Sequence, residues 1–107
     1  MLKQLFKRYE ILPEVLYALK YKLPDKIEVE IKEVDDGYYA KIKNLPGCST
    51  QAKSPQELFE MVNDAVYTYF EIPEIYQPYV QAYIPTEDIR QKFGMKLPAG
   101  DYVLSNA

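Results

Sequence analysis

The sequence predicts an α+β domain in which one long helix covers an antiparallel-rich sheet. Apolar and polar residues alternate over residues 27–32, which is typical of a half-buried strand. An Asp-Gly turn at residues 36–37 then predicts a hairpin. Apolar residues recur at helical spacing over residues 58–70 and indicate an amphipathic helix. The 107 residues suffice for one such domain.

The first 24 residues have a helical pattern and precede the sheet. Apolar side chains recur at helical spacing over residues 2–9 and 15–19, and Pro13 lies between the two runs. We therefore expect one kinked helix or two short ones as an N-terminal helical extension. Residues 1–26 hold six basic and three acidic residues, so this extension is basic. We expect it to pack on the sheet, with binding of a partner or of a second copy as the alternative.

Two strands are expected around the turn that contains Asp35, Asp36 and Gly37. Asp and Gly tolerate the positive φ that a tight hairpin turn demands. The second strand begins at Tyr38 and runs to residue 43, again with alternating residues. Its lysines would lie opposite the glutamates of the first strand and form weak ion pairs, Lys41 and Lys43 against Glu28 and Glu30.

The next segment combines a turn, a third strand and a helix start. The turn residues Leu45, Pro46, Gly47 and Cys48 fix a loop, in which Cys48 is expected to be a small buried residue. Residues 48–52 are the third strand. A capping box follows, with Ser54 as the cap residue, Pro at the first helical position and Glu57 reaching back.

The long helix is the clearest element of the sequence. Its apolar stripe should pack on one sheet face and consists of Leu58, Met61, Val62, Ala65, Val66, Tyr69 and Phe70. Pro73 should stop it. Residues 79–84 are expected to return as a fourth strand at the sheet edge. A short C-terminal helix over residues 85–93 and an irregular tail or short edge strand over 97–107 would complete the chain. The expected units are thus residues 1–24, 25–84 and 85–107.

Composition excludes several classes of chemistry. The chain has no His and one Cys, which rules out His-based catalysis and a zinc site of Cys and His within one chain. No run of about 20 apolar residues exists, so no membrane span is expected. The basic residues near the start argue against a signal peptide, and the single Cys fits a reducing compartment. We therefore expect a cytoplasmic protein without cofactor or metal.

The order and spacing of these motifs resemble the HicB-like antitoxin family. The resemblance covers about half of the chain and is carried by Asp35-Asp36-Gly37-Tyr38-Tyr39, Leu45-Pro46-Gly47-Cys48, Thr50-Gln51, Ser54 and Glu57. It implies a truncated RNase H-like β-β-β-α-β unit that lacks nuclease activity and is usually oligomeric. It also implies a non-enzymatic partner of HicA toxins, which are small ribonucleases that cleave mRNA. Ala52 stands where the family usually has Gly.

Charge then suggests how such an inhibitor would bind. Residues 27–77 hold ten acidic and four basic residues, and a toxin that grips RNA must be basic where it grips. The expected contact residues are Glu28, Glu30, Glu33, Asp35, Glu60 and Asp64.

Other functions are weighed against the same residues. A nuclease would need carboxylates converging on two Mg²⁺ ions, and the expected positions of these side chains do not converge. The segment after residue 84 is too short for a helix-turn-helix, so we expect no DNA binding by this chain alone. The alternative function is an oligomeric scaffold or adaptor without a toxin partner.

Overall fold

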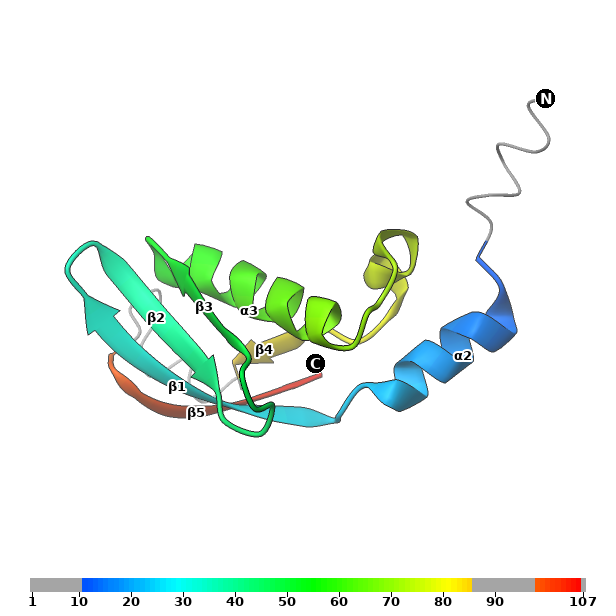
Figure 1. The fold of residues 1–107 in the computed structure, drawn as a ribbon, viewed down its shortest axis with the longest axis horizontal. Coiled ribbons are helices and arrows are strands. Elements are labelled where there is room, and N and C mark those ends of the chain that lie inside the picture. The colour runs from blue at the N-terminus through cyan, green and yellow to red at the C-terminus, as the bar shows by residue number, and fades with distance from the viewer. Residues whose placement is uncertain (1–10, 86–97, 107) are drawn as a thin grey trace, which may run out of the picture.

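A computed structural model of the chain describes residues 11–85 and 98–106. Its elements, in chain order, are α2 (Pro13–Lys22), β1 (Lys26–Val34), β2 (Gly37–Ile42), β3 (Ser49–Ala52), α3 (Pro55–Tyr69), the 3-10 helix η1 (Glu74–Tyr79), β4 (Tyr83–Pro85) and β5 (Gly100–Asn106). The five strands form one sheet in the order β3-β2-β1-β5-β4, and all neighbouring strands are antiparallel. The helix α3 covers one face of this sheet, and the predicted α+β architecture is confirmed (Figure 1).

Alternation along the strands divides the sheet into a core face and an open face. Val29 of β1 lies opposite Ile42 of β2 on one side and Tyr102 of β5 on the other, and all three are buried. Their neighbours on the core face meet Leu58, Val62 and Val66 of α3, which have no exposed surface. Fully burying an aliphatic side chain contributes about 1.5–3 kcal/mol. The layer between α3 and the sheet is therefore the main source of stability.

The C-terminal strands differ from the prediction. Tyr79 ends η1, and the fourth strand is only the three residues Tyr83–Pro85, at the edge of the sheet as expected. The tail was predicted to be irregular or an edge strand, but β5 is an interior strand that pairs with both β1 and β4. The sheet therefore extends beyond the expected boundary at residue 84. The expected helix over residues 85–93 lies largely outside the described residues.

The apolar face of α3 is rotated relative to the predicted stripe. Met61 is 36% exposed and Tyr69 is 44% exposed, whereas Tyr67 is buried. The reason is that α3 also packs toward β4 and the segment before it, where Tyr67 donates a hydrogen bond to the carbonyl of Gln81 at 3.1 Å. This rotation leaves Met61 on the solvent side of the helix.

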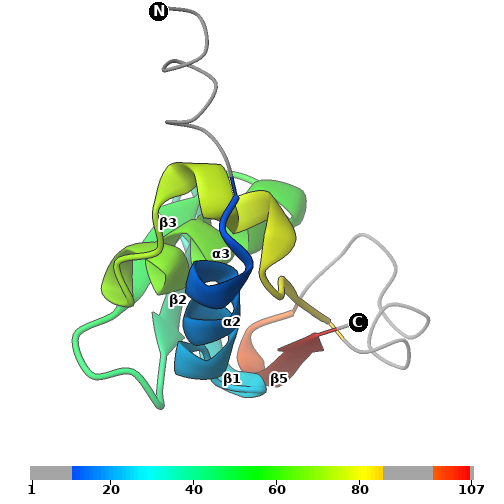
Figure 2. The same ribbon diagram turned by 90° about the vertical axis from the view of Figure 1, so that its right-hand side faces the viewer.

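The helix α2 packs on the end of the domain (Figure 2). Val15, Leu16 and Leu19 are half-buried against the core. The side chain of Gln81 donates a hydrogen bond to the carbonyl of Lys20 at 3.2 Å. As predicted, α2 ends before Pro24. The first predicted helical run, residues 2–9, lies outside the described residues. Within the part of the chain that the structure describes, no helix is long and apolar enough to cross a membrane.

Candidate functional site

The solvent side of α3 has three carboxylates on one stripe. Glu57, Glu60, Met61, Asp64 and Thr68 follow one another at helical spacing and are exposed. We call these five residues the α3 stripe. The helix has no basic residue, and residues 54–85 contain five acidic residues and no Lys or Arg. The stripe is therefore an acidic surface, with Lys53 near its start in the same hollow as Glu57, and Met61 lies in it as an apolar contact point.

The start of α3 is fixed by the predicted cap. The Glu57 backbone N–H donates to the Ser54 hydroxyl at 3.2 Å, and Pro55 occupies the first helical position, so this half of the capping box is confirmed. A side-chain cap of this type contributes about 1 kcal/mol. The carboxylate of Glu57 also lies in the first turn, where the helix dipole favours negative charge. The acidic stripe therefore begins at a well-determined position.

An asparagine that the sequence analysis did not single out attaches α3 to the sheet edge. The Asn63 side-chain oxygen accepts from the Tyr83 backbone N–H at 2.6 Å, and its amide nitrogen donates to the Tyr83 carbonyl at 2.8 Å. The same nitrogen donates to the Phe59 carbonyl at 2.8 Å. The amide thus pairs with β4 as a neighbouring strand would, and it covers part of that edge. The sequence signal for this contact is a polar residue, Asn63, that lies four residues after Phe59 and four residues before Tyr67.

The first two expected contact residues, Glu28 and Glu30, lie on the open face of the sheet rather than beside α3. Glu30 is opposite Lys41, as predicted, but the ion pairs that the structure describes are Glu30 with Lys32 at 3.8 Å and Lys43 with Asp101 at 3.7 Å. These pairs are exposed and contribute little to stability. The open face holds as many lysines as carboxylates in β1, β2 and β5. It is therefore not a strongly acidic surface.

The remaining predicted acidic residues lie in two further places. Glu33 and Asp35 are exposed at the hairpin end of β1, while Glu60 and Asp64 are on the α3 stripe. The fold thus brings the six residues together only in pairs, on three separate surfaces. A partner of ordinary size could contact the hairpin end and α3 together, because Asp36 and Glu57 line one hollow.

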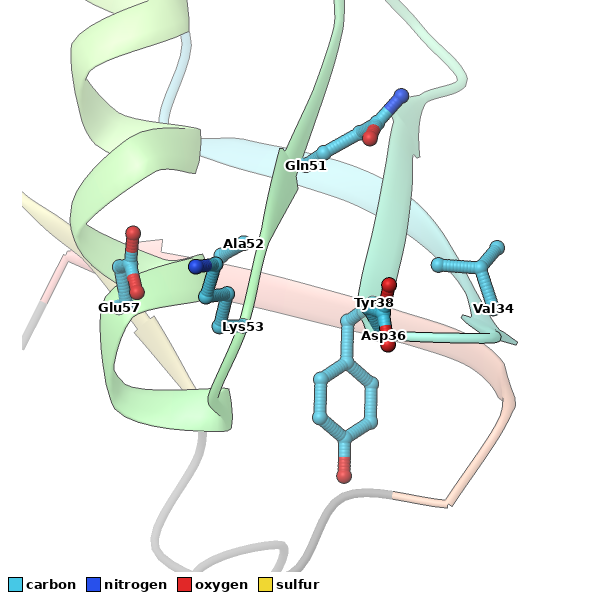
Figure 3. Close-up of a pocket in the computed structure, with 7 residues that line it drawn as sticks. All are labelled: Val34, Asp36, Tyr38, Gln51, Ala52, Lys53 and Glu57. Carbon is cyan, nitrogen blue, oxygen red and sulfur yellow. The ribbon is translucent and has the colours of Figure 1, made fainter.

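This hollow has a volume of about 290 Å³ and lies between the hairpin end, β3 and the first turn of α3 (Figure 3). It is lined by Val34, Asp36, Tyr38, Gln51, Ala52, Lys53 and Glu57. The motifs around the Asp-Gly turn and the helix cap, which are distant in sequence, therefore meet in space. Gly37 allows this contact, since a Cβ there would lie 2.2 Å from the Ala52 carbonyl oxygen.

The loop between β2 and β3 is architectural. Leu45 and Cys48 are buried, and backbone hydrogen bonds join Ile42 to both residues. Gly47 has a φ of 80°, which favours glycine. Burial raises the pKa of the Cys48 thiol and keeps it protonated. Among residues 11–85 and 98–106, no cluster of His, Cys, Asp or Glu is arranged to hold a metal ion.

A second asparagine of this loop region also binds backbone. The Asn44 side chain accepts from the Glu28 N–H at 3.0 Å and donates to the Lys26 carbonyl at 3.3 Å. The Asn44 side chain therefore pairs with the backbone of β1 beyond the end of β2. From the sequence, Asn44 was expected only to break the second strand, because a side-chain amide that pairs with a strand backbone leaves no periodic signal.

The comparisons with known proteins place this chain in a family. The chain is 48% identical over 48 residues to the UPF0150 protein of Archaeoglobus fulgidus, and the match covers 44% of this chain and 70% of that protein. The chain belongs to the UPF0150 family. No protein-family model matches it, and no solved structure matches it. The name of that relative states no activity.

Proposed function

We propose that this UPF0150 chain is a HicB-like antitoxin that binds a small HicA-type ribonuclease toxin. It would neutralise the toxin without chemistry of its own, by covering the surface with which the toxin grips mRNA in the cytoplasm. The observation that carries the proposal is the acidic α3 stripe, in which Glu57, Glu60 and Asp64 are exposed on a helix that has no basic residue. We also propose that the sheet and α3 form a truncated RNase H-like unit, in which β5 lies between β1 and β4.

The physical reason is complementarity with an RNA-binding surface. A protein that binds RNA through its phosphates presents Lys and Arg, and an acidic partner surface occupies the same place. Opposite charges also steer the encounter and raise the association rate. Met61 offers an apolar contact in the middle of the carboxylates, as the centre of a stable interface requires. The α3 stripe therefore combines both properties that such an inhibitor needs.

Among the six expected contact residues, Glu60 and Asp64 become the principal ones. Glu57 joins them because the helix places it on the same stripe. Glu28 and Glu30 share the open sheet face with lysines, so we assign them a smaller contribution. Glu33 and Asp35 at the hairpin end would contact the rim of the same partner.

Co-expression with the adjacent reading frame tests the proposal. We expect the neighbour alone to stop growth and this chain to restore it. The variant E60K/D64K should lose the rescue, while the matched charge reversal E28K/E30K on the open face should retain most of it. A neighbour that is harmless alone, or rescue that is unchanged by E60K/D64K, would contradict the proposal.

The second candidate function is a homo-oligomeric scaffold without a toxin. The exposed aromatic residues of α2, Tyr17 and Tyr21, favour it because large exposed apolar groups commonly mark interaction surfaces. A harmless neighbouring gene together with a stable oligomer of the pure protein would support this function over the antitoxin.

A further inference from the structure

The two outer edges of the sheet differ in how far they are closed. β4 forms one edge, where the side chain of Asn63 accepts from the Tyr83 N–H at 2.6 Å and donates to the Tyr83 carbonyl at 2.8 Å. Pro85 of the same strand has no N–H to donate. A further strand therefore finds few free backbone groups along β4. Soluble proteins commonly protect a sheet edge by such devices.

β3 forms the other edge, and its outward backbone groups have no partner in the part of the chain that the structure describes. The Ile42 N–H donates to the Cys48 carbonyl at 3.0 Å, so these two residues are a hydrogen-bonded pair of the antiparallel ladder. Bonded pairs alternate along such a ladder, which directs the backbone of Thr50 toward β2 and that of Ser49 and Gln51 away from it. Ser49 and Gln51 are also exposed.

The sequence of β3 leaves this edge open to pairing. Its residues, Ser49–Ala52, include no Pro and no charged side chain, which are the residues that commonly block an edge strand. Each of the two outward residues offers one N–H and one carbonyl. An extended peptide that adds to a sheet edge uses the same groups.

The hollow between the hairpin end and α3 lies at the end of this edge. Gln51, Ala52 and Lys53 line it, so part of β3 belongs to both features. Asp36 and Glu57 contribute two carboxylates against the single ammonium group of Lys53 (Figure 3). Neither of the ion pairs found in the described part of the chain involves these three side chains. The charge of the hollow therefore favours a basic side chain.

We propose that β3 is a docking edge for an extended segment of another protein, which adds to the sheet as a further strand and places a Lys or Arg side chain in the hollow. Backbone hydrogen bonds to Ser49 and Gln51 hold the segment, and the hollow selects the basic residue. Every second side chain of a strand lies on the same face, so one basic residue near Ala52 is sufficient. The site goes beyond the proposed antitoxin function, because it uses neither Glu60 nor Asp64 and requires no toxin.

Hydrogen exchange of single amides, followed by nuclear magnetic resonance, tests the docking edge. The probe is the peptide acetyl-Ser-Thr-Val-Arg-Val-Thr-Ser-amide. In the free protein the amides of Ser49 and Gln51 should exchange rapidly, whereas β2 protects the amide of Thr50. Probe at about 1 mM, enough for a weak complex, should slow exchange at Ser49 and Gln51 at least about tenfold.

Changes in the probe separate the backbone contact from the basic side chain and leave the protein intact. Replacing Arg of the probe by Gln should weaken binding at least about tenfold, because the charge-assisted contact in the hollow is lost. A probe that carries a methyl group on every backbone nitrogen should protect neither Ser49 nor Gln51, because it has no N–H to donate to the edge.

Variants of the hollow provide a matched pair. D36N/E57Q removes both carboxylates and should weaken probe binding at least about tenfold. Asn suits a turn as Asp does, and Gln suits the first turn of a capped helix, so the fold should persist. The control D35N/E60Q changes the net charge equally, outside the hollow, and should bind the probe within about twofold of the wild type.

The edge itself is blocked by Gln51→Pro, which removes an outward N–H and leaves the bonds to β2 in place. This variant should keep the circular dichroism spectrum of the wild type and lose protection at Ser49. Rapid exchange at Ser49 and Gln51 with the probe present, slow exchange without it, or equal binding of the methylated probe would overturn the proposal. Gln51→Pro should still rescue growth, and E60K/D64K should still bind the probe, so this proposal and the antitoxin proposal fail independently.

Discussion

Asn63→Ala should destabilise the protein by about 2–3 kcal/mol. The substitution removes the two hydrogen bonds that join α3 to the backbone of Tyr83, at 2.6 and 2.8 Å. Each bond contributes about 0.5–1.5 kcal/mol, and the N–H and carbonyl of Tyr83, a residue with no exposed surface, lose their partners. Alanine is the better helix former, which offsets a few tenths of a kcal/mol. For a domain of this size, the loss corresponds to a fall in Tm of about 10–20 °C.

Urea unfolding followed by far-ultraviolet circular dichroism measures this loss. Asp64→Ala, one residue further along α3 but exposed, is the control and should change stability by less than about 0.5 kcal/mol. Asn63→Asp keeps the acceptor for the Tyr83 N–H but sets a carboxylate against the Tyr83 carbonyl. It should therefore be less stable at pH 7 than at pH 4, relative to the wild type. An Asn63→Ala variant as stable as the wild type would refute the idea that this amide holds the sheet edge.

Three further outcomes are expected. Tyr83→Phe should cost about 1–2 kcal/mol, because the buried Tyr83 hydroxyl donates to the Pro24 carbonyl; thermal unfolding monitors the loss. Gly37→Ala should cost about 2–4 kcal/mol through the clash with the Ala52 carbonyl, and a midpoint in urea equal to the wild type would contradict that contact. Burial raises the pKa of Cys48 and of three tyrosines, so their stabilising effect is complete below pH 9 and is lost as pH rises further. The urea midpoint should then fall above pH 9, with a smaller fall in Tyr83→Phe, and a midpoint that stays level to pH 11 would exclude this coupling.

The elements that depend on neighbours in sequence were predictable. The alternation of Ile27, Val29 and Ile31, the turn at Gly37 and the cap at Ser54 each act over a few residues, and the structure confirms all of them. Leu58 to Val66 likewise place α3 on the sheet. Local patterns were therefore sufficient for the hairpin, the third strand and the long helix.

The elements that depend on distant partners were not predictable in the same way. β5 has only Tyr102 and Leu104 on its core side, too few for a clear alternating pattern, and it becomes an interior strand because β1 and β4 both pair with it. The direction of Met61 depends on how α3 leans toward β4, which Asn63 and Tyr67 determine. For the candidate site, the sequence identified the acidic residues and predicted that their carboxylates do not converge, but the hollow that joins the hairpin end to the start of α3 follows from the sheet topology.

The interior position of β5 also affects how the chain acquires its fold. The residues that pair between β1 and β5 are 69 to 79 positions apart, from Ile31 with Gly100 to Lys26 with Ser105. During synthesis β1 therefore leaves the ribosome long before its second partner exists, and one edge of β1 stays unpaired meanwhile. Pairing at such separation is slow, because a long loop must close before the contacts form. The hairpin of β1 and β2 can form early, but the sheet is completed only after residue 106 has emerged.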